Sequence, residues 1–202
     1  MTSQSSSNRA SKRLHLGCGR TILPDWVNLD LQAGPGVDVV ADLDRCHECP
    51  LPFEADTFGE FLASHLFEHL RNPLPFMQEL HRIAKPGAQA VFRVPYGSSD
   101  DAVEDPTHVR LCFLNTFSFF SQPFYWRADY GYRGDWQTDC IRLKVSSQRY
   151  KGKSPQEVMD DVMHLRNVVR EMVVEMVAVK PIRAAQKELQ TTPHIALTLI
   201  EP

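Results

Sequence analysis

Residues 14–31 read LHLGCGRTILPDWVNLDL, which places a glycine turn between two apolar runs and an aspartate, Asp30, near the end of the second run. Glycines in a turn after a strand let the backbone approach a ligand closely, because no Cβ intrudes. An acidic side chain at the end of the next strand can accept hydrogen bonds from the ribose hydroxyls of a bound nucleoside. The stretch therefore predicts two strands of a sheet with a nucleoside-type cofactor at their carboxyl ends.

The glycine turn itself narrows the class of cofactor. The chain continues from Gly17 and Gly19 through Ile22 without the third glycine of the dinucleotide fingerprint. That glycine allows close packing beside a pyrophosphate, so its absence favours a cofactor with a nucleoside but no pyrophosphate. S-adenosylmethionine fits this description, and an NAD-type oxidoreductase is the less favoured alternative.

The connection between the two strands is unusually short. Six residues, Arg20 to Asp25, separate the glycine turn from the next apolar run, whereas a parallel crossover normally needs about a dozen or more. We therefore expect a shortened first crossover without a full helix. That leaves one side of the cofactor pocket thinly covered, and we expect the N-terminal tail or an aromatic-rich segment further along the chain to cover it.

Short apolar segments with β-favouring residues alternate with a helical pattern over the first half of the chain. A helix is predicted over Pro73–Ala84, where apolar residues recur three apart before a Lys-Pro-Gly stop. This alternation is typical of an α/β fold with a mostly parallel sheet. The predicted strands are Arg13–Leu16, Trp26–Leu29, Val37–Ala41, Phe58–Ala63, Ala88–Val94, Asp139–Val145 and His194–Ile200.

Composition and charge limit the functional class. The 202 residues carry a net charge of −3, which argues against a nucleic-acid or anionic-membrane surface as the main partner. We find no apolar run long enough to span a membrane and no secretory signal, and the odd number of cysteines favours free thiols in a reducing cytoplasm.

We expect a disordered tail at 1–12 and one domain at 13–202, with a cofactor-binding half at 13–96 and a substrate or oligomerisation half at 97–202.

Five motifs follow one another over residues 13–96, namely LHLGCG, VNLDL, DVVADLD, LPFEADTFGEFLASHLFEHL and ELHRIAKPGAQAVFRVPY. In this order and spacing they resemble the class I S-adenosylmethionine-dependent methyltransferases of the small bacterial kind. The resemblance implies methyl transfer from S-adenosylmethionine, with S-adenosylhomocysteine as the product. It also implies a Rossmann-like sheet of seven strands, mostly parallel, with the last strand antiparallel.

The resemblance further implies roles for residues at the carboxyl ends of the strands. In the family these positions contact the methionine end, the ribose and the adenine of the cofactor. The matching residues are Gly17, Cys18 and Gly19 for the methionine end, Asp30 for the ribose, Leu31, Asp42 and Leu43 for the adenine, and Ser64 and His65 for cofactor or substrate contacts.

The segment HLFEH offers a first candidate for the reacting end, where the acceptor must lose a proton to a histidine or carboxylate. His65, Glu68 and His69 would share one helical face if the strand end turned directly into a helix. Two imidazoles and a carboxylate so placed can bind a divalent metal ion. Some metal-dependent O-methyltransferases have a similar motif that begins with glutamate in place of His65, so we favour a structural Glu68–His69 pair over a metal site.

A second candidate stands in the segment DPTHVR, residues 105–110. His108 would emerge from a loop after the strand that ends near Tyr96. Ligands of open α/β sheets bind outside the carboxyl ends of the strands, so we expect His108 to contact the substrate or to act as the general base.

The second half contains an aromatic segment, Phe113 to Trp136, which holds ten of the nineteen aromatic residues of the chain. These side chains predict either the wall of an acceptor pocket or the core of this half. We expect O-methylation of a small or saccharide-like molecule. The alternative is a non-catalytic cofactor-binding or scaffold protein that retains the sheet.

A long helix is predicted between the last two strands. Ser154 to Glu157 forms a capping box with proline at the first helical position. From Val158 to Val179 apolar residues recur with alternating gaps of four and three, which predicts a helix over 155–180. At about 35 Å it would outrun strands of about 20 Å, so we expect part of its apolar stripe to form a homodimer interface.

Overall fold

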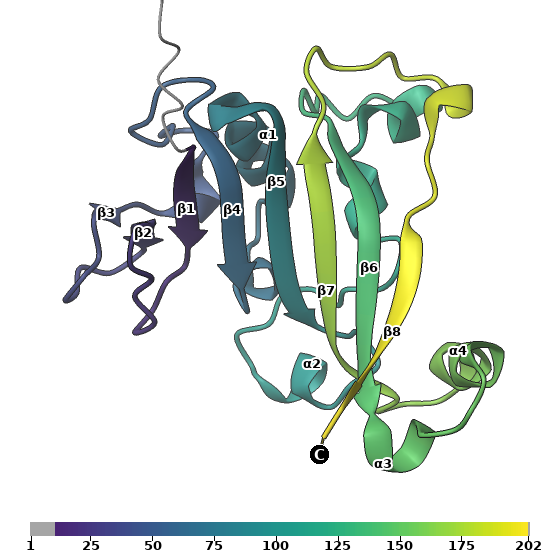
Figure 1. Ribbon diagram of the computed structural model, residues 1–202. Coiled ribbons are helices and arrows are strands. Elements are labelled where there is room, and N and C mark those ends of the chain that lie inside the picture. The colour runs from purple at the N-terminus through teal and green to yellow at the C-terminus, as the bar shows by residue number, and fades with distance from the viewer. Residues whose placement is uncertain (1–10, 202) are drawn as a thin grey trace, which may run out of the picture.

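The computed structural model describes residues 11–201, and its centre is an eight-stranded sheet (Figure 1). Most of the predicted tail at 1–12 lies outside the described residues. The strands are β1 Lys12–Leu16, β2 Val27–Asp30, β3 Val39–Val40, β4 Phe58–Ser64, β5 Ala84–Pro95, β6 Trp136–Ser146, β7 Val169–Ala178 and β8 His194–Ile200. The α-helices are α1 Pro73–Ile83, α2 Asp101–Glu104, α3 Ser147–Tyr150 and α4 Pro155–His164, and the 3-10 helices are η1 Leu43–Arg45, η2 Phe67–His69, η3 Phe117–Phe120, η4 Gln122–Trp126 and η5 Lys187–Leu189.

The strand order is β3-β2-β1-β4-β5-β7-β6-β8. Neighbouring strands are parallel except at β7, which pairs antiparallel with both β5 and β6. The predicted Rossmann-like, mostly parallel sheet is confirmed. Two details are corrected. The described chain has eight strands rather than seven, and the antiparallel strand is β7, whereas the last strand, β8, lies parallel to β6 at the edge of the sheet.

The long helix predicted over 155–180 is wrong. The capping box at Ser154 does start a helix, but α4 ends at His164 and the chain enters strand β7 at Val169. Asn167, between them, has a left-handed backbone with φ of 57°. The segment that follows is rich in valine, which favours strands, and it pairs with β5 and β6 on its two sides.

The apolar stripe of the predicted helix is instead one face of β7. Met172, Val174 and Met176 alternate with less buried residues, as expected for a strand with one face in the core. This stripe is therefore internal to the sheet and does not form the predicted dimer surface.

One face of the sheet is covered by α1 and the aromatic segment, and we call it the covered face. Trp136 is fully buried, packs edge-to-face on Phe61 at 5.8 Å and donates from Nε1 to the carbonyl oxygen of Met77 at 3.0 Å. Asp135, which is also fully buried, accepts from Arg183 Nε and Nη2 at 2.8 Å each. Much of the aromatic segment therefore belongs to the core.

The opposite face of the central strands carries no helix among residues 11–201, and Figure 1 looks onto it. We call it the open face. Charges on neighbouring strands pair across it: Arg142 Nε lies 2.7 Å from Glu175 Oε1, and Arg93 Nη2 lies 3.1 Å from Glu171 Oε2. Other partly exposed residues on this face include Lys144, Val173 and Val177.

The first crossover is as short as predicted. The six residues from Arg20 to Asp25 form turns and irregular backbone without a helix. Within the described part of the chain, no helix combines the length and the apolar character that crossing a membrane requires.

Candidate functional site

The glycine turn lies at the carboxyl end of β1 and packs against the segment that follows β4. Gly17 and Gly19 have left-handed backbones, with φ of 61° and 52°. A Cβ on Gly17 would lie 2.9 Å from Leu66 Cδ1, whereas a Cβ on Gly19 would meet nothing within 4 Å. Gly17 therefore packs closely against the end of the Leu66 side chain, and Gly19 leaves open space beside the turn.

Asp30 joins this turn to the end of β2. Its Oδ2 accepts from the backbone N–H of Gly19 at 2.7 Å, and its Oδ1 accepts from Gln32 N at 3.1 Å. A cavity of about 580 Å³ opens here, which is within the range of small-molecule sites. Its lining residues are Gly19, Arg20, Asp30, Gln32, Ala33, Gly34, Pro35 and Val37.

The other predicted cofactor residues are distributed around this end of the sheet. Asp42 caps η1, with Oδ1 accepting from Asp44 N at 3.0 Å. Leu43 and Cys18 are buried, and Leu31 is exposed. Only Gly19 and Asp30 of the predicted set line the glycine-turn cavity.

His65 begins the second part of the site, directly after β4. Its backbone is left-handed, with φ of 50°, so it does not belong to the helical turn of η2. Its Nε2 lies 3.1 Å from Glu171 Oε1, and this hydrogen bond, followed by the proximity of Glu68, raises the pKa of His65 to about 9. His65 is therefore tied to β7 and does not share a face with Glu68 and His69 as predicted. Ser64, the last residue of β4, is partly exposed.

Glu68 is the most unusual side chain of the site. It is 1% exposed, and neither carboxylate oxygen has a hydrogen-bond partner among the described residues. The nearest cationic or imidazole nitrogens to Oε1 are His65 Nδ1 at 3.4 Å and His108 Nε2 at 4.0 Å. A buried carboxylate without a hydrogen bond is costly, so the environment of Glu68 requires an explanation.

His69 and His108 stand beside this carboxylate with defined ring orientations. His108 Nδ1 lies 3.1 Å from the carbonyl oxygen of Ala102, an acceptor, so Nδ1 carries the proton. Thr107 Oγ1 donates to Asp105 at 2.6 Å and therefore accepts from His69 Nδ1 at 3.0 Å. Both imidazoles thus keep an unprotonated Nε2 when they are neutral.

The loop that carries His108 is tied to the segment that carries Glu68. Val109 N donates to the carbonyl oxygen of Glu68 at 2.9 Å, and Arg110 Nε donates to that of Leu70 at 2.9 Å. The imidazole rings of His69 and His108 meet edge to face, with centroids 4.7 Å apart. Within residues 11–201, Glu68, His69 and His108 form the one group whose ligand atoms all lie within 4.8 Å of one another.

Sequence reasoning found these three residues but not their grouping. It placed His65 with Glu68 and His69, and it treated His108 as a separate base. The structure exchanges His65 for His108 in the group. Only one feature of the sequence could have predicted the grouping: the segments that carry Glu68 and His108 follow neighbouring parallel strands, so both lie at the carboxyl ends of the strands.

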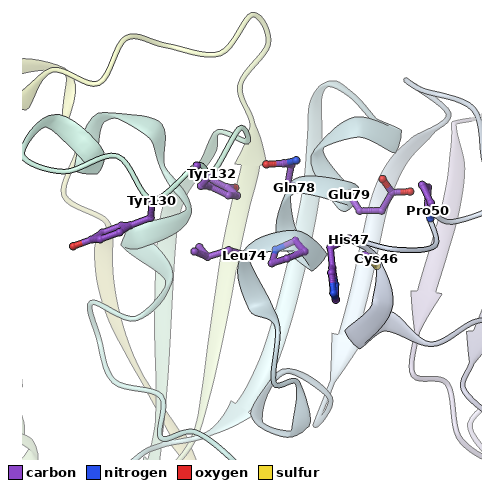
Figure 2. Close-up of a pocket in the computed structure, with 10 residues that line it drawn as sticks. Cys46, His47, Pro50, Leu74, Gln78, Glu79, Tyr130 and Tyr132 are labelled. Carbon is purple, nitrogen blue, oxygen red and sulfur yellow. The ribbon is translucent and has the colours of Figure 1, made fainter.

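Other cavities lie nearby or elsewhere on the molecule. In Figure 2, residues of α1 stand between the Cys46–Pro50 loop and the side chains of Tyr130 and Tyr132, around a cavity of about 460 Å³. Burial raises the pKa of Cys46 to about 12, so this thiol is not a ready nucleophile. None of the predicted site residues lines this cavity.

Two further cavities lie near the carboxyl ends of the strands. One of about 510 Å³ is lined by Tyr96 and part of the aromatic segment, including Phe113 and Phe119. One of about 300 Å³ is lined by His65, Asp101, Lys144, Arg170, Glu171 and Ile200. The aromatic segment therefore supplies both core and cavity wall.

Comparison with known proteins adds the following. Residues 14–92 match a family model described as a methyltransferase domain. Among solved structures, the chain is similar to a SAM-dependent methyltransferase from Archaeoglobus fulgidus, with 15% identity and a TM-score of 0.57 over 83% of this chain and 86% of that one. It is also similar to a SAM-dependent methyltransferase from Thermotoga maritima (11% identity, TM-score 0.51, 83% and 82% covered) and to the cyclase SpnF (12% identity, TM-score 0.51, 84% and 75% covered). No curated protein matches the chain.

Proposed function

We propose that the chain is a class I S-adenosylmethionine-dependent methyltransferase and that it transfers a methyl group to an oxygen atom of a small or saccharide-like molecule. S-adenosylmethionine is its cofactor. One observation carries the proposal. The glycine-turn cavity with Asp30 lies at the carboxyl ends of the parallel strands, and so does the group formed by Glu68, His69 and His108. They are linked where Gly17 packs against Leu66.

The glycine-turn cavity fits a nucleoside-type cofactor. Space is open beside Gly19, where a Cβ would meet no atom within 4 Å. Two backbone N–H groups hold the Asp30 carboxylate at this cavity, and we propose that it accepts the ribose hydroxyls. The remaining proposed cofactor contacts are Gly17, Cys18, Leu31, Asp42, Leu43, Ser64 and His65.

The group Glu68, His69 and His108 suits an oxygen acceptor. Bound S-adenosylmethionine supplies an electrophilic methyl group on a sulfonium centre. A hydroxyl is a weak nucleophile until its proton is removed, so the protein must orient it and assist that loss. An unprotonated Nε2 on His69 and on His108, next to a buried carboxylate, provides for this, and His108 is the proposed base.

The cavity beside His65 supports a polar acceptor. Its walls combine the cationic side chains of Lys144 and Arg170 with the carboxylates of Asp101 and Glu171. Such a mixture of donors and acceptors suits a molecule that carries several hydroxyl groups. A saccharide-like acceptor has this chemistry.

The proposed compartment is the cytoplasm. All five cysteines are free in the structure, including Cys18, Cys46 and Cys112, which are buried. Free thiols persist in a reducing environment, which supports this assignment.

Calorimetric titration with S-adenosylhomocysteine tests the cofactor side. Asp30→Ala should weaken binding by about 1–3 kcal/mol, because the ribose hydroxyls lose a charged acceptor. Asp160→Ala, which removes an exposed carboxylate on α4, is the matched control and should bind normally. Unchanged affinity in a folded Asp30→Ala variant would remove Asp30 from the site.

Transfer of a labelled methyl group to a panel of sugars, phenols and amines tests the acceptor side. We expect product only with oxygen acceptors. His108→Ala should lower turnover by about 10²–10⁴-fold and leave S-adenosylhomocysteine affinity nearly unchanged. Methylation confined to amines would contradict the oxygen acceptor. Cofactor binding without transfer to any acceptor would favour the scaffold alternative.

A further inference from the structure

We propose that Glu68, His69 and His108 bind one divalent transition-metal ion. The inference rests on the proposed function, which it deepens by giving the acceptor side of the site a Lewis acid. The metal site that the sequence analysis treated as less favoured consisted of His65, Glu68 and His69, whereas the site proposed now keeps Glu68 and His69 and has His108 in place of His65.

The buried carboxylate is the first of these observations. Glu68 is 1% exposed and both of its oxygens lack hydrogen-bond partners among the described residues. Buried polar groups in native proteins nearly always have a partner, and an exception points to a bound ion or a functional role. A cation between Glu68 and the two histidines would supply the missing partner.

The two imidazoles are the second observation, because their tautomers are set from outside the group. The carbonyl oxygen of Ala102 holds the proton on His108 Nδ1, and Thr107 Oγ1 holds the proton on His69 Nδ1. Metal-ligating histidines usually donate the other ring N–H to such an acceptor, which fixes the ring and raises its basicity. Thr107 Oγ1 in turn donates to Asp105 Oδ1 at 2.6 Å, so a carboxylate orients the hydroxyl that accepts from His69.

The geometry of the group is the third observation. One ligand atom from each residue lies within 4.8 Å of the other two, and His108 Nε2 lies 4.0 Å from Glu68 Oε1. Ligand atoms that share an ion at about 2.0–2.2 Å lie about 3–4 Å apart. A contraction of at most about 1–2 Å closes the set, and the bond from Val109 N to the Glu68 carbonyl oxygen already joins the two segments.

The donor set indicates the class of ion. Two imidazole nitrogens and one carboxylate oxygen suit zinc, iron, cobalt or manganese, whereas magnesium and calcium prefer oxygen ligands alone. Three protein ligands leave positions open for an acceptor hydroxyl. In this arrangement His108 would hold the ion and so would not itself serve as the base proposed above. The ion would lower the pKa of the acceptor hydroxyl, so that its proton could pass to water before the oxygen attacks the methyl group.

One rival explanation of Glu68 is that it serves only as a countercharge to His65, whose Nδ1 lies 3.4 Å away. That contact lacks hydrogen-bond geometry, since Glu68 Oε1 has no hydrogen-bond partner. The Nε2 of His65 is already bonded to Glu171. This explanation also does not account for the fixed ring orientations of His69 and His108.

The test is the binding of Co²⁺ alone to the full chain, after treatment with a chelator that is then removed. The visible d–d absorption of Co²⁺ reports its ligand set, and activity plays no part in the readout. We expect one equivalent to bind with a saturable spectrum, and Zn²⁺ to displace it. Glu68→Gln, which keeps the side-chain shape, and His108→Ala should each weaken binding by at least about tenfold.

Two further variants serve as controls. His164→Ala removes an exposed histidine on α4 and should leave the Co²⁺ spectrum and affinity unchanged. His65→Gln separates the rival explanation, because the proposed site predicts that Co²⁺ still binds without His65. Circular dichroism shows whether each variant is folded, and if His108→Ala is not, Glu68→Gln carries the test.

Absence of a saturable spectrum would overturn the site, as would equal Co²⁺ affinity in the parent chain, Glu68→Gln and His108→Ala. The proposed function fails by different results. A chain that binds Co²⁺ at these residues but methylates no oxygen acceptor retains the metal site and loses the proposed function. A chain that methylates an oxygen acceptor in the presence of the chelator, and binds no Co²⁺, retains the proposed function and loses the metal site.

Discussion

The two faces of the sheet are built by different means. On the covered face, Phe61, Trp136 and Val174 are almost completely buried beneath α1 and the aromatic segment. On the open face, Arg142 pairs with Glu175 and the described residues supply no helix. Parallel sheets usually have both faces covered. In this protein the open face carries charge pairs between neighbouring strands in place of a second layer of helices.

This difference has a direct bearing on function. The short crossover at Arg20–Asp25 removes a helix that would otherwise pack beside the glycine turn. The candidate site therefore combines a cofactor cavity on thinly covered strands with a histidine group that two tied segments hold firmly. Stability and catalysis should depend on different faces, and the following predictions examine that separation in order of effect.

The largest effect is expected at the centre of the covered face. Trp136→Ala should lower the free energy of unfolding by about 3–5 kcal/mol, because it removes a buried ring and leaves a cavity. Urea denaturation followed by circular dichroism measures the change. Trp126→Ala is the matched control, since Trp126 is 39% exposed and should lower the free energy of unfolding by clearly less. Equal losses in the two variants would mean that the covered face is not the dominant core.

A smaller loss is expected where the aromatic segment is tied to the sheet. Arg183→Met removes two hydrogen bonds from the fully buried Asp135, which keeps backbone donors at Gln122 and at residue 183. A buried carboxylate without its ion partner should lower stability by about 2–4 kcal/mol. Adding Asp135→Asn to this variant should recover part of the loss. Strictly additive losses would show that the two side chains do not interact.

Much of this fold follows from patterns in the sequence. Strands β1, β2, β4 and β5 were predictable because short apolar runs alternate with turn signals along this part of the chain. Strand β7 was not, since its buried residues Met172 and Met176 are four apart and satisfy both a helical and a strand period. Pairing with β5 and β6 decides that this segment is a strand and not a helix. The local sequence does not reveal such long-range pairing.

The candidate site was predictable to a similar extent. Gly19 and Asp30 follow neighbouring strands, and parallel strand ends meet, so their contact could be anticipated from the sequence. The group at Glu68 could not, because two backbone features set it. His65 has a left-handed backbone that removes it from the turn of η2, and the bond from Val109 N to the Glu68 carbonyl oxygen brings His108 in.

Neighbouring valines of β7 provide a matched comparison of the two faces. Val174 is fully buried on the covered face, and Val173 is partly exposed on the open face. Val174→Thr should lower the free energy of unfolding by about 1–3 kcal/mol, because it buries a hydroxyl. Val173→Thr should change it by no more than about 0.5 kcal/mol. Similar losses in both would indicate that something covers the open face in solution.

The smallest effect is expected for the charge pair on the open face. Arg142 Nε lies 2.7 Å from Glu175 Oε1, but the two side chains are 47% and 38% exposed, so water and salt screen their attraction. Glu175→Gln should therefore lower the free energy of unfolding by less than about 1 kcal/mol, and the difference should shrink further as salt is added. A double-mutant cycle with Arg142→Gln isolates the pair from the effects of each substitution alone. A coupling energy well above about 1 kcal/mol that persists in high salt would require a pair shielded from water. The open face would then be covered, and the contrast between the two faces would not hold in solution.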